Sequence, residues 1–379
     1  MSNLLIIYLH EKIFCFYFKF PEYFDQSSKT WHRTPQKKLF YSFYLTEVIV
    51  FVIGVFIAAV ELLHAVKMAN ILATVILIIA INGCGFDVSW GLAMFRWSQD
   101  FVAFTNALIN EVHHLPGVAG IQKRTKKWNQ FIITFATFLI GCSILPIPFA
   151  IFQAYLTVQG RFSFILYSMS NSICPLETYL TCKLLTFVLT ASLYFFIAFH
   201  VSASISAAVV NAALLLNMVI GCINNLTTKN FNCRTIHMYQ KIYIVLKFLE
   251  PMATLISTIL LLMGFGTSVT CNFMSIRMLG VVPMPFYLYI PVAAVSAIIG
   301  IGTLLPYSTV CHAKSSKLLA GWKYCGGRER GYVDKMVNGL RPIGFQVGFG
   351  GSTYFVLKRS TKSKYYSAIL DGTFNILLA

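Results

Sequence analysis

The chain has 379 residues, of which 57% are hydrophobic and 11% charged, against roughly 45–50% and about 25% in ordinary soluble domains. One aqueous core cannot enclose so much apolar surface, so the composition excludes an ordinary soluble protein and indicates an integral membrane protein. The formal net charge of +17 would also suit nucleic-acid binding. The basic residues lie between apolar runs, however, and we therefore expect no nucleic acid among the partners.

The apolar runs predict seven membrane-spanning helices and an all-α fold. A helix needs about 20 apolar residues to cross a bilayer. The segments that meet this requirement, in chain order, are 40–63, 68–90, 131–156, 184–222, 251–271, 286–310 and 361–379.

The fourth span is unusually long, because no Lys, Arg, Asp or Glu lies between residues 184 and 228. It is either one long helix or two spans joined around residues 202–206. With one long helix and a cytoplasmic N-terminus, 26 of the 30 Lys and Arg residues fall on the cytoplasmic side, as such residues usually do. Dividing the run would move two basic segments outside. The charge pattern therefore predicts one long fourth helix, a cytoplasmic N-terminus and an extracellular C-terminus.

Ionisable residues inside the spans are candidates for function, because each costs free energy in lipid. Glu47 and Asp87 lie near the cytoplasmic ends of the first two spans, where they can reach the membrane interface. A contact between helices and a functional site both fit these two residues. His200 lies midway along the fourth span and fits either a packed residue or a ligand contact.

The outer halves of the third and fourth spans are rich in aromatic residues. Apolar pockets with a few polar groups are the usual sites for small ligands. We therefore predict a small-molecule pocket lined by Phe149, Phe152, Gln153, Tyr194 and His200.

The last span carries a polar stripe. Ser367, Asp371 and Asn375 recur at four-residue spacing and so lie on one helix face. A charged group near mid-membrane costs about 2.5–3.5 kcal/mol on insertion scales, so Asp371 should face water or a partner. A buried hydrogen bond between helices and a water-filled pore both satisfy this requirement.

Motifs for catalysis are absent from the sequence. It contains no Gly-x-Ser-x-Gly, His-Glu-x-x-His or Walker loop, and its ten cysteines have no metal-binding spacing. We therefore expect no enzyme activity, no cofactor and no metal site. Cys174 and Cys182, in an external segment, are candidates for a disulfide bond.

The C-terminal residues resemble the arthropod gustatory and odorant receptor superfamily. Residues 340–343 (Leu-Arg-Pro-Ile), the glycines at 348, 350 and 351, and residues 358–361 are similar to the approach to that family's last helix. Residues 367–374 resemble the run into its terminal motif, which is Thr-Tyr, five mostly apolar residues, then Gln-Phe. Thr373 matches, Phe374 replaces the Tyr, Asn375 occupies an apolar position, and the Gln-Phe has no counterpart. The predicted topology also resembles that of the family.

This resemblance implies a divergent, gustatory-like chemosensory receptor that acts as a ligand-gated, non-selective cation channel in the plasma membrane. In the family, the last helices of four subunits line the pore. That assigns the pore to Ser367, Asp371, Thr373, Phe374 and Asn375. The implied partners are the lipid bilayer, a small-molecule tastant or odorant, and identical or related receptor subunits.

This interpretation divides the chain into four regions. They are a cytoplasmic N-terminal segment (1–39), a six-helix ligand-binding region (40–310), a cytoplasmic basic loop and anchor segment (311–360), and a pore-lining last helix (361–379). The alternatives are a non-conducting scaffold with seven membrane helices and a secondary transporter. A transporter should show an inverted repeat and a broken helix, and neither is visible in the sequence.

Overall fold

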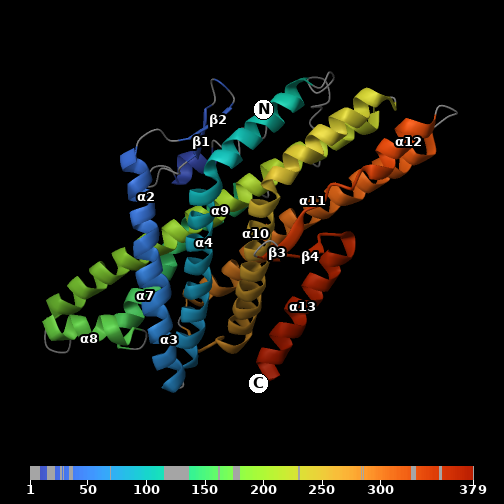
Figure 1. The fold of residues 1–379 in the computed structure, drawn as a ribbon. Coiled ribbons are helices and arrows are strands. Elements are labelled where there is room, and N and C mark those ends of the chain that lie inside the picture. The colour runs from blue at the N-terminus through green and yellow to red at the C-terminus, as the bar shows by residue number, and fades with distance from the viewer. Residues whose placement is uncertain are drawn as a thin grey trace.

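The computed structural model describes residues 9–14, 22–25, 28, 30–33, 37–68, 70–114, 136–160, 163–173, 180–228, 231–282, 284, 286–325, 330–349 and 352–378. Its helices include α2 (Lys37–Ile49), the π-helix η1 (Val50–Ile57), α3 (Ala58–Lys67), α4 (Ile71–His114), α7 (Pro146–Val158), α8 (Phe164–Ile173), α9 (Leu180–Thr228), α10 (Cys233–Arg277), the 3-10 helix η2 (Phe286–Leu288), α11 (Tyr289–Cys325), α12 (Arg330–Gly339) and α13 (Arg359–Leu378). The strands are β1 (Glu22–Asp25), β2 (Thr30–Arg33), β3 (Gln346–Phe349) and β4 (Ser352–Val356). Figure 1 shows that the long helices form one bundle, with α13 at its edge.

Six helical segments of the described chain are long and apolar enough to cross a membrane. They are Phe43–Lys67, Ile71–Asn110, Ala136–Val158, Leu180–Thr228, Cys233–Arg277 and Ile290–Lys323. They coincide with the first six predicted spans, which confirms a multi-pass membrane protein. The seventh predicted span is the helix α13, but its composition does not place it in this set. Its passage through the membrane stays a prediction.

The fourth span is a single helix of 49 residues, α9. It does not break at residues 202–206, since no Pro or Gly lies between residues 184 and 220 to interrupt its hydrogen bonds. The third span is interrupted only at Leu145, whose backbone stays helical, and α7 begins at the next residue, Pro146. A proline has no amide hydrogen and fits best in the first turn of a helix, which explains this position.

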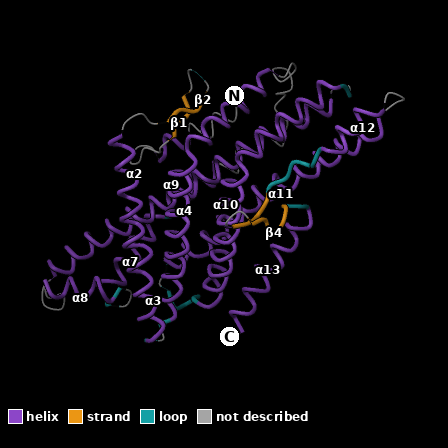
Figure 2. The backbone as a smooth tube through the Cα atoms, in the orientation of Figure 1, coloured by secondary structure: helices purple, strands orange, loops and turns teal. Residues whose placement is uncertain are grey.

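Two β-hairpins make the all-α prediction incomplete (Figure 2). The strands β1 and β2 pair antiparallel, as do β3 and β4. The second hairpin depends on Gly348, because a Cβ added there would lie 1.9 Å from the carbonyl oxygen of Ser352. The strands are too short to give a clear alternating pattern in the sequence.

The basic segment 311–360 has regular secondary structure in most of its length. The helix α11 continues to Cys325, and α12 and the second hairpin follow. The backbone amide of Gly348 donates to the hydroxyl of Thr258 on α10, at 2.8 Å. This contact fixes the hairpin to α10 immediately before α13 begins. Figure 1 shows α12 and the first hairpin at one end of the bundle, and the end of α13 at the opposite end.

Candidate functional site

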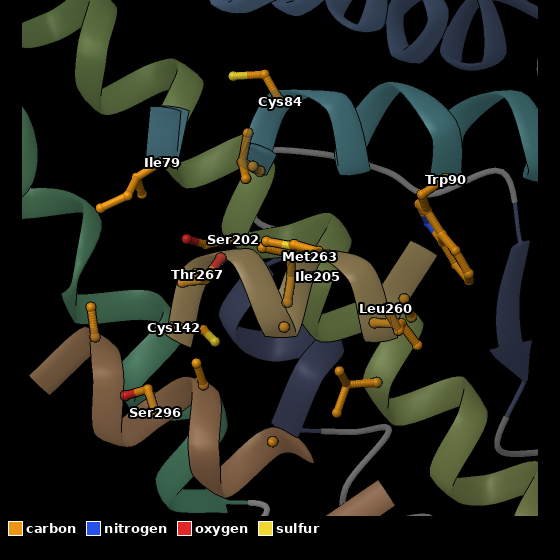
Figure 3. Close-up of a pocket in the computed structure, with 18 of the residues that line it drawn as sticks. Ile79, Cys84, Trp90, Cys142, Ser202, Ile205, Leu260, Met263, Thr267 and Ser296 are labelled. Carbon is orange, nitrogen blue, oxygen red and sulfur yellow. The ribbon is translucent and has the colours of Figure 1, made fainter. Parts of the chain in front are cut away.

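A cavity of about 370 Å³ lies among η1, α3, α4, α7, α9, α10 and α11. Its volume is in the range of sites that hold small molecules, about 300–1,000 Å³. Most of its wall is apolar. Figure 3 shows side chains from several helices around the space, including Ile79, Trp90 and Cys142. The polar residues in the wall include Gln153, Tyr194, Ser202, Asn211, Thr267 and Ser296.

The cavity wall also includes a buried carboxylate that the sequence did not predict. Glu61 on α3 is 3% exposed. It accepts hydrogen bonds from the Ser163 hydroxyl at 2.8 Å, the Phe164 amide at 2.9 Å and the Ile165 amide at 2.6 Å. These amides begin α8, so the carboxylate satisfies a helix N-terminus whose dipole attracts negative charge. A lone acid within an otherwise apolar run was the available signal for this residue.

The five predicted pocket residues occupy different places. Phe149, Gln153 and Tyr194 line the cavity, and the Tyr194 hydroxyl lies 3.2 Å from that of Thr157. Phe152 is buried instead in an apolar cluster beside the cavity. His200 does not line the cavity either. The structure therefore brings three of the five side chains together around one space.

His200 lies instead with Glu47 and Asp87. Its Nδ1 is 2.8 Å from Oδ2 of Asp87, and donor atoms from all three residues lie within 4.8 Å of one another. Neither acid uses its position near a span end to reach the membrane interface, because Glu47 is only 6% exposed and Asp87 is fully buried. The helices α2, α4 and α9 cross here and turn these side chains inward, which spacing along the sequence does not reveal.

The predicted pore residues lie on α13. Ser367, Asp371, Phe374 and Asn375 are exposed, whereas Thr373 is buried and its hydroxyl donates to the Ile369 carbonyl at 2.8 Å. The Ser367 hydroxyl donates to Asp371 Oδ2 at 3.4 Å. Within the described residues, Asp371 thus bonds along its own helix and not to a neighbouring one. The polar stripe is the outer face of α13.

The inner face of α13 packs on the helices that form the cavity wall. The Tyr365 hydroxyl donates to the Leu261 carbonyl on α10 at 2.8 Å, and Leu261 itself lines the cavity. Gly372 sits against the same helix, since a Cβ added there would lie 3.2 Å from Val269 and 3.3 Å from Phe265. A single helix layer therefore separates the cavity from α13.

Cys182, near the start of α9, is disulfide-bonded. This agrees with the prediction that it forms a disulfide bond. The predicted partner, Cys174, lies outside the described residues.

Among solved structures, the fold matches the insect olfactory receptor OR5 from Machilis hrabei. The structure of that receptor in complex with eugenol aligns with a TM-score of 0.59 and 11% sequence identity, over 99% of this chain and 97% of that one. A second structure of the same receptor gives a TM-score of 0.58 and 10% identity over the same shares. No protein-family profile and no curated protein sequence matches the chain. At this identity the likeness establishes the fold, which is the one that the resemblance of the C-terminal residues implies.

Proposed function

We propose that this chain, which has the fold of the insect olfactory receptors, is a chemosensory receptor of the gustatory-like kind and a subunit of a ligand-gated cation channel. The observation that carries the proposal is the arrangement of cavity and last helix. An apolar cavity of about 370 Å³ lies one helix layer away from α13, whose polar stripe is exposed.

The cavity is the ligand site in this proposal. Its apolar wall favours small, largely apolar molecules, because burial of apolar surface drives their binding. Gln153 and Tyr194 provide polar groups that fix the orientation of such a ligand. A structure of the related receptor holds eugenol, which supports a small-molecule ligand here as well.

The last helix is the seventh span and lines the pore. Four chains, identical or related, meet around α13, so that Asp371 becomes a ring of carboxylates that attracts cations. Such an assembly gives the exposed stripe of Ser367, Asp371 and Asn375 an aqueous surface to face. The cytoplasmic N-terminus, the extracellular C-terminus and the plasma-membrane location belong to the same proposal. The excess of Lys and Arg in the segments predicted to be cytoplasmic supports this orientation.

Gating requires the ligand to bind one arrangement of α13 better than another, since only differential affinity shifts a conformational equilibrium. Leu261 and Gly264 provide the physical route. Both line the cavity. The Leu261 carbonyl accepts the hydrogen bond from Tyr365 of α13, and a Cβ added at Gly264 would lie 3.1 Å from the same hydroxyl. A ligand that displaces this part of α10 changes the support of the pore helix directly.

The test is current through purified full-length protein in planar bilayers, with ligand binding followed by the fluorescence of Trp90 and the other tryptophans. Trp90 lines the cavity and should report an occupant. We expect small apolar compounds that change the fluorescence to open a conductance for both Na⁺ and K⁺. Saturable binding without conductance would support the scaffold, and ligand uptake into vesicles without conductance would support the transporter.

A further inference from the structure

Two glutamates on the first membrane-spanning segment are buried in contrasting surroundings. Glu61 accepts three hydrogen bonds, as described above. Glu47 is more than nine-tenths buried, yet neither of its carboxylate oxygens has a hydrogen-bond partner among the described residues. A buried carboxylate without partners is strongly unfavourable, so Glu47 calls for a group that its neighbours in the chain do not supply.

The Glu47 side chain is aimed at a specific place. A Cβ added at Gly91 would lie 2.5 Å from its carboxyl carbon and 2.6 Å from Oε1, so the missing side chain of Gly91 makes room for this carboxylate. Asp87 lies four residues before Gly91 and therefore on the same face of α4. Asp87 is fully buried, and its Oδ1 also has no hydrogen-bond partner in the described part of the chain.

His200 completes the cluster, with Nδ1 2.8 Å from Oδ2 of Asp87. Two donor atoms about 2.1 Å from an ion lie about 3 Å apart in an octahedral site and about 3.4 Å apart in a tetrahedral one. The observed separation of 2.8 Å is closest to the octahedral value, and a slight movement of either side chain gives the tetrahedral one. The third donor, from Glu47, lies within 4.8 Å of both, so a small movement of its side chain closes the site.

The chemistry of the donors selects the kind of ion. One imidazole nitrogen and two carboxylate oxygens suit zinc and the other divalent transition metals, whereas calcium takes six to eight oxygen ligands. A dication also balances the two carboxylate charges in an apolar interior, where unbalanced charge is most costly.

We propose that Glu47, Asp87 and His200 form a binding site for a divalent transition-metal ion, with Zn²⁺ as the reference ion. The ion joins α2, α4 and α9, which are the first, second and fourth spans. It reaches the site from the cavity. Cys84 and Trp90 lie three residues before and after Asp87, on the same side of α4, and both line the cavity. The three ligands are far apart in the chain, so they form no metal-binding motif in the sequence.

The experiment uses the full-length chain in lipid nanodiscs, stripped with a chelator and then titrated with Zn²⁺ or Co²⁺. We expect one ion per chain by elemental analysis after desalting, visible Co²⁺ absorption bands of a nitrogen and oxygen site, and a melting temperature that rises with Zn²⁺ concentration. An ion that binds only the folded state must stabilise it in this way. Mg²⁺ at the same concentrations should leave the melting temperature unchanged.

The variants Glu47→Gln and His200→Gln should each weaken Zn²⁺ binding by at least about 100-fold, since each removes a direct ligand, and even outer partners of ligands contribute about 10–100-fold. The matched controls are Glu250→Gln and His237→Gln, which remove the same groups from the partly exposed or exposed surface of α10 and should leave binding unchanged. Far-ultraviolet circular dichroism checks that each variant is folded.

The proposal is overturned if the folded wild-type chain binds no Zn²⁺ or Co²⁺ beyond what Glu47→Gln retains, or if the control variants lose the same amount. Where Glu47→Gln does not fold, the Co²⁺ spectrum of the wild type and its loss in His200→Gln decide the question. A wild-type chain without Co²⁺ bands and without a Zn²⁺-dependent melting temperature would show that the cluster holds protons only.

Discussion

Polar side chains are buried in the helices around the cavity but exposed along one face of the last helix, α13. Around the cavity, Glu61 is held by α8, Gln153 is buried, and His200 pairs with Asp87. On α13 the polar stripe of Ser367, Asp371 and Asn375 is exposed, as are the apolar Leu370 and Phe374, while Ile369 and Thr373 turn inward. In the proposed assembly, one chain completes the cavity by itself, whereas the exposed face of α13 is completed by other chains. Ligand recognition and ion conduction should therefore respond to different substitutions.

The largest expected effect is on conduction, at Asp371. In a fourfold assembly, Asp371→Lys replaces a ring of carboxylates with a ring of ammonium groups and should reduce cation current to near zero. Asp371→Asn keeps the shape and removes the charge, so it should lower single-channel conductance or divalent block without loss of surface expression. Ligand potency should change in neither variant. Single-channel recording beside surface labelling measures both quantities, and wild-type conductance in Asp371→Asn would remove this residue from the permeation path.

A matched pair of phenylalanines on α7 should separate recognition from stability. Phe149 lines the cavity, whereas Phe152 packs outside it. Phe149→Ala should weaken ligand potency by about 10–100-fold, while Phe152→Ala should cost about 3–5 kcal/mol of folding free energy, as large aromatic truncations in cores do. Neither should change single-channel conductance. Dose–response curves and thermal unfolding of both variants check this, and equal potency shifts in the two would place the ligand elsewhere.

The contact between the two regions should give a smaller effect. Tyr365→Phe removes the hydrogen bond to the Leu261 carbonyl and little else. A typical hydrogen bond contributes about 1 kcal/mol, so the ratio of open to closed channels at saturating ligand should change about fivefold. Conductance and the binding curve from tryptophan fluorescence should stay as in the wild type. Tyr366→Phe, which removes the neighbouring hydroxyl on the same helix, serves as a control for the loss of a hydroxyl alone. An unchanged ratio of open to closed channels in Tyr365→Phe would remove this contact from the gating route.

The sequence predicted what local composition controls. Length and hydropathy located the first six spans, and the lack of charge and of helix breakers located the single long helix α9. It missed what depends on contacts between distant segments. The Glu61 carboxylate finds its partners about a hundred residues away at the start of α8, and Glu47, Asp87 and His200 meet only where three helices cross. The second hairpin was not predicted for the same reason, since its Gly348 is held by a hydrogen bond to Thr258 of α10.

The most direct test of the channel proposal is the arrangement of copies around α13. Single-particle imaging of the full-length protein in nanodiscs should show four chains with α13 at the central axis and Asp371 facing it. The cavity of each chain should lie away from that axis, behind α10. A monomer, or an assembly in which the exposed face of α13 points toward lipid, would contradict the account, because the polar stripe would then have no aqueous surface to face.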